Sequence, residues 1–582
     1  MLNRRINKRI KVLKFALLFI FLIILMRLFQ VQVLEHDKYI EKVKGMEKIV
    51  YSLTSPRGRV FDRNGVLLVD NEPVKVLRYG KLDNDSDYEK EIAFKLSEIL
   101  NIDQNVIYKK MNNGYYFDLK TIKENLTDQE YALISELDLK GVFLEIGFKR
   151  VYKTEYFNKM FGSIGSIPAE KKDYYLNNGY NLNDIVGISY IEELYDDILK
   201  GEKSKYKYTK NKYELVSEGK KGNDIYLTID IKLQEEVEKI LEKEIKKAKA
   251  EPNTKYYNHS YVIVSDPNTG EILAMSGKKI VDGVFYDITP DIFVTTVTAG
   301  SVVKGASHFV GYKESALSFG EVRKDFCIKI KNTEAKCSWR NLGTLNDLTA
   351  LKYSSNSYQF QTAIKLGKGK YVFNKPLVLE EAALKKYREI FSLFGLGVKT
   401  GSDFFESSGY KGAKRSSGSI LDFAIGQYDT YTPIQLNQYI NTIANGGYRL
   451  KPLILKKYQN IDVLKEVLNE IQEKDYLERI QKGFKMVMDL DGTGANYINL
   501  KYKPAGKTGT STGYIDINND NIVDVSTTSN TFVGYAPYDN PIVAFTVISP
   551  DVKPSKSYSS YKTNVNKKIS YEVSKKFFEI YK

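Results

Sequence analysis

The chain has 582 residues, of which 42% are hydrophobic and 27% charged, and these proportions exclude a disordered or collagen-like chain. Its length exceeds that of a single small module, and its two cysteines are too few for a disulfide scaffold or a zinc-ribbon array. Lysine and arginine number 87 against 72 acidic residues, a formal net charge of +15. Outside the amino terminus no basic run is concentrated enough to demand a nucleic-acid partner, so we expect none.

The amino terminus predicts a membrane anchor. Every residue from Phe15 to Met26 is apolar, and the basic stretch before them contains no acid. With neighbouring apolar residues the span is about 17 residues, the short end of the range that crosses a bilayer as a helix. A cleaved signal peptide is the alternative, but no small-x-small cleavage site follows. We therefore expect an uncleaved, single-pass transmembrane anchor over residues 12–34.

The basic residues before the anchor set its orientation. The positive-inside rule places residues 1–14 in the cytoplasm and everything after about residue 34 outside the cell membrane. Residues 35–220 are rich in Lys, Asn, Asp and Tyr with short apolar runs, which predicts an extended, mixed pedestal domain. A polar, glycine-bracketed stretch then precedes a clear strand. We therefore expect a second extracellular domain over residues 222–582.

The pattern of this second domain predicts an α+β fold. A strand is expected at residues 225–229, and a helix is expected over 233–245, where apolar residues recur at helical spacing. One strand pair is expected around the turn at Asp266–Gly270 and another around Asp539–Pro541. The residues between these pairs have the patterns of helices and loops. Strands at both ends with helices between them are typical of an α+β domain.

Three short motifs of catalytic residue types occur in order within this domain. They are Ser301-Val302-Val303-Lys304, Ser354-Ser355-Asn356 and Lys507-Thr508-Gly509-Thr510. Each motif alone is weak, because chance matches are expected in a lysine-rich chain. Further Ser-x-x-Lys sequences begin at Ser217, Ser276, Ser408 and Ser559, and a second Lys-Thr-Gly begins at Lys399.

The context of each motif separates the set from the chance matches. Ser-x-x-Lys on a helix places a hydroxyl and an amine one turn apart on the same face. Gly300 allows a tight entry into such a helix, whereas Ser217 and Ser276 lie in polar glycine–lysine turns where no helix is expected. The motif at Lys507 precedes the terminal strands, where an edge strand can line a groove. Lys399 follows a helix end, which indicates a loop.

The trio is typical of class A β-lactamases and penicillin-binding proteins, in which the second motif is often Ser-Asp-Asn. The whole chain resembles a class B penicillin-binding protein, the monofunctional transpeptidase type. The similar segments are Arg57–Gly65, Val186–Glu192 (with Tyr190 where a glycine is usual), Asp266–Met275, Ile425–Gln427, Thr432–Gln435 and Ala444–Gly447. The resemblance implies a dimerisation-like pedestal and a serine D,D-transpeptidase domain. Neither a glycosyltransferase domain before them nor a wall-binding module after them is expected.

The residue types predict how the reaction begins. A serine hydroxyl is a poor nucleophile until a base takes its proton. With no histidine in the motifs, Lys304 is the natural base for Ser301, provided that burial and the second cation, Lys507, depress its pKa. Ser354 is expected to relay the proton to the leaving amine. The Asn356 amide is expected to hold the substrate peptide and to help to place Lys304.

The resemblance implies the remaining parts of the site. Backbone N–H groups of Ser301 and Thr510 would form the oxyanion hole. Lys507 and the hydroxyls of Thr508 and Thr510 suit a terminal carboxylate, with Gly509 placed beside them in the substrate site. The implied substrate is the D-alanyl-D-alanine end of a peptidoglycan stem peptide. Acylation would expel D-alanine, an amine from a neighbouring stem would form the crosslink, and β-lactams would acylate the same serine.

The first motif departs from the family pattern. Proline before Gly300, Thr-Phe inside the motif and proline after its lysine are usual, whereas this chain has Ala299, Val302-Val303 and Gly305. Catalysis does not need those side chains, but the β-branched pair and the glycine weaken a helix. Reactivity towards substrate or β-lactams can therefore differ.

Two other functions stay open at this point. A β-lactamase would share the trio, but it has no use for residues 35–220, and no deacylating glutamate is identified. A membrane-bound β-lactam sensor or a non-catalytic cell-wall scaffold would bind without turnover. Rapid penicillin hydrolysis would favour the first, and a stable adduct without crosslinking activity would favour the second.

A metal site is expected between the first two motifs. Cys327 and Cys337 lie there, and His308 follows Lys304 by one helical turn. Two thiolates and an imidazole suit a tetrahedral zinc, with Asp325 as a candidate fourth ligand. The resemblance implies zinc in certain anaerobes and a cysteine pair in some Gram-positive relatives. A disulfide is the main alternative because the domain is expected outside the cell, and free thiols are the third. No cofactor is expected to be required for catalysis.

The resemblance also implies partners. Because no glycan polymerase is expected in the chain, it would work beside a SEDS-type membrane glycosyltransferase and other divisome or elongasome proteins. Contacts would run through the transmembrane helix and residues 35–220, and the lipid-linked precursor would supply the glycan. Division, elongation and sporulation are equally compatible with the sequence.

Overall fold

The computed structural model describes residues 2–35, 48–51, 55–81, 86–113, 119–182, 184–209, 212–413, 416–518, 520, 522–554 and 563–581. Its contacts divide the chain into two compact units. One unit comprises residues 1–58, 71–151 and 200–222, and the other comprises residues 59–70, 152–199 and 223–582. The sequence predicts two continuous domains that meet near residue 220. Each compact unit is instead made of three segments that are separated in the sequence.

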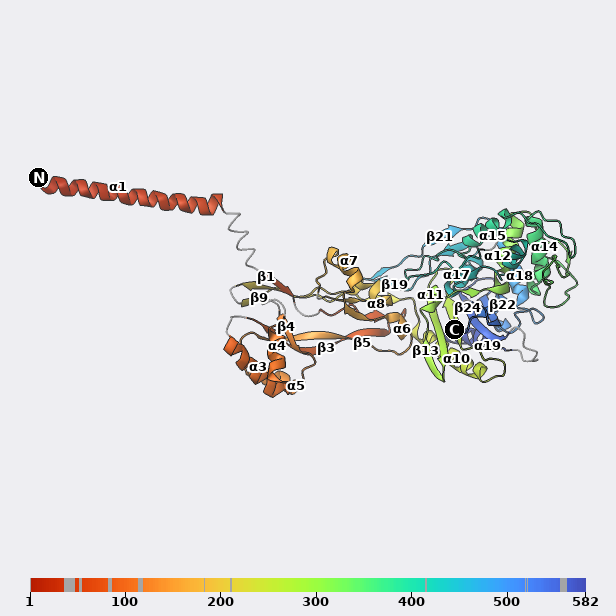
Figure 1. The fold of residues 1–582 in the computed structure, drawn as a ribbon, viewed down its shortest axis with the longest axis horizontal. Helices are drawn as coiled ribbons and strands as arrows, with labels where there is room; N and C mark the ends of the chain where they lie inside the picture. Colours follow the sequence, from red (N-terminus) through yellow and green to blue (C-terminus); the bar gives the residue numbers. More distant parts are fainter. Residues whose placement is uncertain are drawn as a thin grey trace. The chain divides into compact units, whose positions relative to one another are not determined.

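The first helix fits a membrane anchor. It is α1 (Leu2–Phe29), which continues into a short π-helical segment at Gln30–Leu34 (Figure 1). Within the part of the chain that the structure describes, Ile10–Leu34 is the one helical stretch long and apolar enough to cross a membrane. Its large apolar side chains are exposed, as expected for a helix that contacts lipid and not for the core helix of a globular domain.

The smaller unit combines a small sheet with a helical cluster. A three-stranded sheet has the order β1-β8-β9. Its strands are β1 (Lys48–Tyr51), β8 (Lys205–Thr209) and β9 (Lys212–Ser217). The cluster contains α3 (Ser86–Leu100), α4 (Gln104–Met111), α5 (Asp128–Glu136), β4 (Leu119–Lys123), and those parts of β3 (Leu67–Gly80) and β5 (Val142–Tyr152) that lie within residues 71–151. Apolar residues at helical spacing, such as Ile92 and Leu96, pack there against Leu77 and Ile122.

The larger unit is built on a six-stranded antiparallel sheet with the order β13-β12-β11-β24-β23-β22 (Figure 1). Its strands are β11 (His259–Ser265), β12 (Ile272–Val281), β13 (Val284–Asp287), β22 (Ala505–Ile515), β23 (Val525–Ala536) and β24 (Val543–Pro554). The predicted strand pairs around Asp266–Gly270 and Asp539–Pro541 are confirmed as β11–β12 and β23–β24. β22 ends the strand order and is an edge strand, as predicted for the third motif.

Helices cover both faces of this sheet. α10 (Ile231–Lys249) and α19 (Val565–Ile580) pack on one face, and α17 (Pro433–Ala444) packs on the other. Strand β11 shows why both faces are apolar, because successive side chains alternate between them. Ile263 belongs to the core with α17, whereas Val264 belongs to the core with α10 and α19. The α+β class predicted from the sequence is confirmed.

The remaining helices of this unit are α6 (Asn158–Phe161), α7 (Lys172–Asn177), α8 (Tyr190–Leu194), α9 (Asp196–Leu199), α11 (Asp291–Val294), α12 (Lys304–Lys313), α13 (Asp347–Lys352), α14 (Asn356–Leu366), α15 (Ala382–Leu393), α16 (Ser417–Ala424) and α18 (Lys474–Val487), with 3-10 turns at Ala169–Lys171, Gly300–Val303 and Leu500–Tyr502. Its short strands are β2 (Val60–Phe61), β6 (Ile164–Ser166), β7 (Ile185–Gly187), β10 (Ile225–Leu227), β14 (Val297–Thr298), β15 (Arg323–Lys324), β16 (Thr344–Leu345), β17 (Thr430–Tyr431), β18 (Tyr448–Leu450), β19 (Leu455–Tyr458), β20 (Ile461–Asp462) and β21 (Val467–Glu470). The helices α12, α14, α15, α17 and α18 share one large apolar core.

From Arg59 onward, the segment that resembles the family's first pedestal motif belongs to this larger unit. β2 pairs in parallel with β10. The carboxylate of Asp62, fully buried, accepts the N–H groups of Asn64 and Val66, both at 2.8 Å, and that of Ile231 at 3.2 Å. One carboxylate therefore closes the turn after β2 and also satisfies a backbone donor at the start of α10.

The glycine of the later pedestal motif gives a test of this fold. A Cβ on Gly187 would stand 1.8 Å from the carbonyl oxygen of Glu192, which is backbone and has no side-chain freedom to move aside. Gly187→Ala should therefore lower the free energy of unfolding by about 1–3 kcal/mol, measured as a lower thermal midpoint. Gly418→Ala in α16, where no atom lies closer than 3.7 Å to the added carbon, should leave the midpoint unchanged or raise it slightly. Equal midpoints for the two variants would contradict this packing.

Candidate active site

The first motif enters its helix through a tight turn, as predicted. Ser301 is half-buried on the 3-10 turn that leads into α12. Gly300 has a φ of +63°, in the left-handed region that favours glycine, and its N–H donates to the carbonyl of Gly426 at 2.9 Å. A Cβ on Gly300 would stand 2.7 Å from the carbonyl oxygen of Thr510. The turn that carries Ser301 therefore lies directly against β22, which carries the third motif.

The side chain of Lys304 is buried and held by the second motif. Its Nζ donates to the backbone carbonyl of Ser354 at 2.8 Å and to Oδ1 of Asn356 at 2.7 Å, and it lies 3.3 Å from Oγ of Ser354. Ser354 has a φ of +57°, an uncommon conformation for a non-glycine residue, which turns its carbonyl and its hydroxyl to the same amine. Asn356, which is expected to help to place Lys304, thus lies within hydrogen-bond distance of its amine.

The third motif brings a second buried amine to the same hydroxyl. Nζ of Lys507 donates to Oγ of Ser354 at 2.9 Å and to the carbonyl of Thr508 at 2.9 Å. The Ser354 hydroxyl therefore lies between the amines of Lys304 and Lys507. It is in hydrogen-bond contact with both, which is the position that a proton relay needs.

Burial shifts the pKa values of both lysines. Removal from water lowers the pKa of Lys304 well below its ordinary value, the charge of Lys507 lowers it further, and Asp325 opposes the shift. Burial lowers the pKa of Lys507 to about 7. Because a neutral amine has a free lone pair, the arrangement favours Lys304 as a base near neutral pH.

The rest of the third motif lies along the open edge of β22. Thr508 is half-buried and Thr510 is exposed, so both residues are accessible from solvent. A Cβ on Gly509 would stand 2.6 Å from the carbonyl oxygen of Ala299, so this glycine permits the close approach of β22 to the first motif. The amide of Gln427 donates to the Thr510 carbonyl at 3.3 Å and closes the same side of the site.

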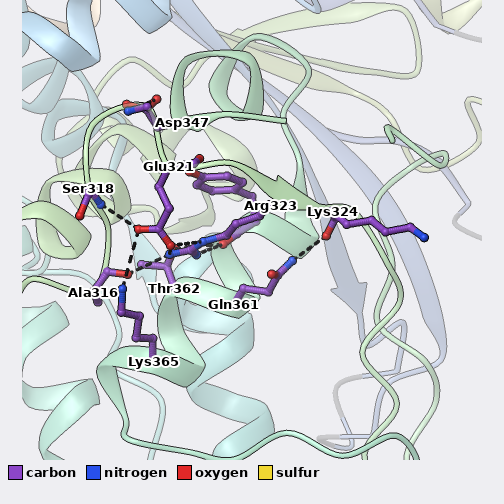
Figure 2. A network of polar contacts seen from close by, with 11 residues as sticks. Ala316, Ser318, Glu321, Arg323, Lys324, Asp347, Gln361, Thr362 and Lys365 are labelled. Carbon is purple, nitrogen blue, oxygen red and sulfur yellow. Dashed lines mark hydrogen bonds and ion pairs between the residues drawn. The ribbon is translucent and has the colours of Figure 1, made fainter. Parts of the chain in front are cut away.

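A polar network fixes the helix that follows the second motif, as Figure 2 shows. The guanidinium of Arg323 donates to Glu321 at 2.7 Å, to the Thr362 hydroxyl at 2.7 Å and to the Ala316 carbonyl at 2.9 Å. Glu321 in turn accepts the N–H of Ser318 at 3.0 Å. Because Thr362 lies on α14 and Ala316 follows α12, these bonds hold α14 and α12 in one relative position.

The zinc site predicted at Cys327, Cys337 and His308 is wrong. The two sulfur atoms are bonded to each other as a disulfide. His308 lies buried elsewhere, with its ring nitrogens 3.1 Å from the carbonyl oxygens of Lys304 and Asp347, and burial lowers its pKa to about 4. Within the described ranges, no three His, Cys, Asp or Glu side chains are placed to share a metal ion. The histidine shares a helix with Lys304, but its ring faces the core and not the cysteines.

Among the described residues, the chance matches at Ser217, Ser276 and Lys399 lie apart from the three motifs in different elements. Ser276 is buried within β12 and Ser217 ends β9, so the prediction that they lie in turns is wrong, although neither lies on a helix. Lys278 gave that segment its polar pattern, but its charge is paired with Glu238 at 2.6 Å, which permits a buried strand. Lys399 lies in a loop, as predicted, and Ser559 lies outside the described residues.

The family departures in the first motif are accommodated by packing. Val302 and Val303 are fully buried in the core, where their branched side chains add apolar area. A Cβ on Gly305 would stand 2.6 Å from the hydroxyl oxygen of Tyr439, and that hydroxyl donates to the Val302 carbonyl at 2.8 Å. The tyrosine thus occupies the space beside the glycine and supports the turn of a helix whose own residues form helices poorly.

One supporting residue carries no motif signal in the sequence. The hydroxyl of Ser338 accepts the backbone N–H groups of Asn356 at 3.0 Å and Ser357 at 3.2 Å. It therefore caps the start of α14 from a distant loop. In the sequence, Ser338 is distinguished only by its position directly after Cys337.

Family models match most of the chain. A model of the penicillin-binding protein transpeptidase domain matches residues 260–574, and a model of the penicillin-binding protein dimerisation domain matches residues 52–227. Penicillin-binding protein 2A of Bacillus subtilis is 34% identical, over 98% of this chain and 93% of its own length. Penicillin-binding protein 2B of Streptococcus pneumoniae is 30% identical, over 88% of this chain and 79% of its own length.

Further relatives agree in activity and fold. The peptidoglycan D,D-transpeptidase MrdA of Acinetobacter baumannii is 24% identical, over 90% of this chain and 82% of its own length. The solved structure of penicillin-binding protein 2B from S. pneumoniae strain R6 matches with a TM-score of 0.77 at 25% identity, over 92% of this chain and 98% of that one. A complex of PBP2 and MreC from Helicobacter pylori matches in fold with a TM-score of 0.70 at 18% identity, over 92% of this chain and 99% of that one. Two buried lysines contact the same serine hydroxyl in this site, and the family models and relatives match most of the chain. The chain belongs to the class B penicillin-binding proteins and is a serine D,D-transpeptidase of peptidoglycan synthesis.

Proposed function

We propose that Ser301 is the nucleophile of this transpeptidase and that Lys304 is its general base. The observation that carries the proposal is the placement of Lys304, a buried amine with a strongly lowered pKa, held by Ser354 and Asn356 one helical turn from Ser301. In its neutral form this amine takes the hydroxyl proton as Oγ of Ser301 attacks the carbonyl carbon of the penultimate D-alanine.

The acyl-enzyme forms when the peptide bond to the last D-alanine breaks. Backbone N–H groups of Ser301 and Thr510 stabilise the negative oxygen of the tetrahedral intermediate. The proton held by Lys304 passes through the Ser354 hydroxyl to the leaving nitrogen, and free D-alanine departs. An amine of a neighbouring stem peptide then attacks the ester, which restores Ser301 and completes the crosslink. A β-lactam opens its ring on Ser301 in the same way, but the leaving amine stays attached.

The third motif binds the substrate's terminal carboxylate. Lys507 supplies positive charge, and the hydroxyls of Thr508 and Thr510 supply hydrogen bonds from the open edge of β22. Gly509 keeps this strand close to the first motif, so the bound carboxylate lies at a fixed distance from Ser301. The amide of Asn356 donates to the Cys337 carbonyl at 3.0 Å, and in the complex it also holds the peptide of the substrate.

Fluorescent penicillin tests the nucleophile. Ser301→Ala should abolish covalent labelling, because Ser301 is the hydroxyl that lies one helical turn before the buried amine of Lys304. Ser276→Ala is the matched control. Ser276 also begins a Ser-x-x-Lys sequence, but its hydroxyl is buried in β12 without a hydrogen-bond partner among the described residues, so labelling should persist. Labelling that survives the loss of Ser301 would overturn the assignment, and rapid release of hydrolysed penicillin would indicate a β-lactamase instead.

The two lysines predict a bell-shaped pH dependence of acylation. A lowered pKa leaves Lys304 neutral above that value, so the second-order acylation rate should fall as decreasing pH protonates it. Lys507 must be charged to bind a carboxylate, and its pKa of about 7 means that the rate should also fall as pH rises past neutrality. Lys507→Arg, which stays charged, should extend the alkaline side of the profile. A wild-type rate that stays flat above pH 7 would exclude this role for Lys507.

The chain is proposed to expose its catalytic domain outside the cell. The support is the apolar helix over Ile10–Leu34 after a basic start, which favours a cytoplasmic tail. The pedestal over residues 35–220 and the transmembrane helix are proposed to bind a SEDS-type glycosyltransferase, because a D,D-transpeptidase needs glycan strands to crosslink. The likeness in fold to the H. pylori protein solved with MreC supports an MreC-type partner of the elongation machinery. Crosslinking in membranes that captured neither kind of partner would contradict this proposal.

Selective thiol labelling of intact cells tests the orientation. The native cysteines form a disulfide and do not react with a maleimide. A membrane-impermeant maleimide should therefore label a Glu98→Cys variant, whose changed residue is exposed on α3, and should leave an Asn3→Cys variant unlabelled until the cells are opened. The reverse pattern would show that the domain faces the cytoplasm.

A further inference from the structure

A buried carboxylate lies behind the second motif. The side chain of Asp325 is largely buried, and its Oδ2 accepts two hydrogen bonds, one from the hydroxyl of Ser338 at 2.7 Å and one from that of Ser355 at 2.7 Å. Hydrogen bonds to a charged acceptor are stronger than neutral ones. One carboxylate therefore fixes the direction of two hydroxyl groups from different parts of the chain.

The same two hydroxyls also fix the backbone at the start of α14. With their protons committed to Asp325, their oxygens accept backbone N–H groups: Ser338 accepts those of Asn356 and Ser357, and Ser355 accepts that of Tyr358 at 3.0 Å. These are the donors that a helix leaves unsatisfied in its first turn. The negative charge of Asp325 also lies at the end of the helix where a negative charge is favourable.

The helix start in question carries the groups that hold the catalytic amine. Asn356 is the first residue of α14, and Ser354, two residues earlier, has the left-handed backbone that brings its carbonyl to Lys304. A loose helix start would release both contacts with Nζ of Lys304. Asp325 therefore acts on the position of the Lys304 amine indirectly, through the hydroxyls of Ser338 and Ser355 and the backbone at the start of α14.

The disulfide joins the two chain segments that carry Asp325 and Ser338. Asp325 precedes Cys327 by two residues, and Ser338 follows Cys337 directly. The backbones between them pair through Ile328 and Lys336, whose N–H and carbonyl groups exchange hydrogen bonds of 2.8 Å in both directions. The Cys337 carbonyl also accepts the side-chain amide of Asn356 at 3.0 Å. The crosslink therefore keeps the carboxylate and the serine that depends on it at a fixed separation.

We infer that Asp325 is a positioning residue for the transpeptidase reaction, and that together with Ser338 and the Cys327–Cys337 disulfide it forms a clamp that holds Ser354 and Asn356 against Lys304. The inference rests on the proposed roles of Ser301 and Lys304. Within the described residues, Asp325 and Ser338 make no hydrogen bond to Ser301 or to the amine of Lys304. Its effect on acylation is carried by the geometry of the second motif.

The charge of Asp325 predicts an effect on the pH profile of acylation, which a residue with only a structural role would not produce. Two charged groups act on the amine of Lys304: Lys507 lowers its pKa and Asp325 raises it. His308, whose ring contacts the Lys304 carbonyl, is neutral at ordinary pH because burial lowers its pKa to about 4. Removal of the Asp325 charge should therefore lower the pKa of Lys304 and move the acidic side of the acylation profile to lower pH.

Two substitutions at Asp325 separate charge from hydrogen bonding. Asp325→Asn keeps an oxygen that can accept both hydroxyls, so acylation by fluorescent penicillin should keep a similar maximum with its acidic side displaced to lower pH. Asp325→Ala removes the acceptor, and the maximum rate should fall about ten- to a hundredfold as the second motif loosens. Ser338→Ala should slow acylation in the same direction, and Ser338→Thr, which restores a hydroxyl, should recover most of the rate.

Asp422→Asn is the matched control. Asp422 also binds this loop, through Lys336 at 2.6 Å, but it belongs to α16 and has no hydrogen bond to the second motif. Its loss should leave the pH profile and the maximum rate within about twofold of the wild type, a change expected of an isolated, partly exposed ion pair. All rates are measured on the full chain in detergent, below the melting temperature of each variant, so that loss of fold is not counted as loss of rate.

Thiol counting and reduction test the third part of the clamp. Denatured protein should show no reactive thiol without reductant and two after reduction. A Cys327→Ala/Cys337→Ala variant should be acylated several-fold more slowly, and reductant should slow the wild type but not this variant. Chelators should change neither protein.

The outcomes distinguish the clamp from the proposed function. Labelling that does not depend on Ser301 would overturn the proposed function itself. Labelling that depends on Ser301 but is equally fast in the wild type, Asp325→Ala and Ser338→Ala would overturn the clamp alone. A slower Asp325→Ala variant would also count against it if Asp325→Asn left the acidic side of the profile in place, because the effect would then be one of folding alone.

Discussion

The burial of two neighbouring amines, whose charges also repel each other, is the constraint on which the active site depends. Lys304 and Lys507 both contact the Ser354 hydroxyl, and among the described residues neither has a carboxylate in direct contact. In a poorly solvated interior, two neighbouring ammonium groups without counter-ions are costly. We propose that Lys304 is the group that gives up its proton, because burial and the charge of Lys507 both lower its pKa. We propose that the fold generates its base by withholding water and direct contact with a counter-charge.

Three segments that are far apart in the chain must meet for this pair to exist. The helical core supplies the first two motifs, and the edge of the sheet supplies the third. Their backbones approach closely because glycines occupy the contact points, with Gly300 and Gly509 between the first motif and β22. Any side chain there would push the strand outward and lengthen the distance between the two amines. The stability of the sheet, whose central strands are buried on both faces, is therefore part of the catalytic apparatus.

The sequence predicted the elements whose signals are local. Periodicity located α10 and both strand pairs, and the three motifs identified residues that the structure brings together. The metal site could not be judged in this way, because the spacing of Cys327, Cys337 and His308 does not reveal which way the histidine ring points from its helix. Ser276 was misplaced because its neighbour Lys278 suggested a polar turn, whereas pairing with Glu238 allows that lysine in a buried strand. Ser338 was missed because it acts through backbone groups far along the chain. Such contacts depend on tertiary structure, which has no short-range pattern.

The larger unit is built from segments that are separated in the sequence. This limits how the chain can be cut into fragments that fold. β10 has two partners in this unit, β19 on one side and β2 on the other, and β2 comes from residues more than a hundred positions earlier in the sequence. A fragment that began at residue 223 would keep all three motifs but would expose one edge of β10 and leave the backbone N–H of Ile231 without its Asp62 acceptor. Open strand edges of this kind recruit other strands and promote aggregation. The catalytic piece of this protein is therefore defined by a set of separate chain segments, and the short strand β2 near the start of the sequence covers an edge of the far larger body that follows it.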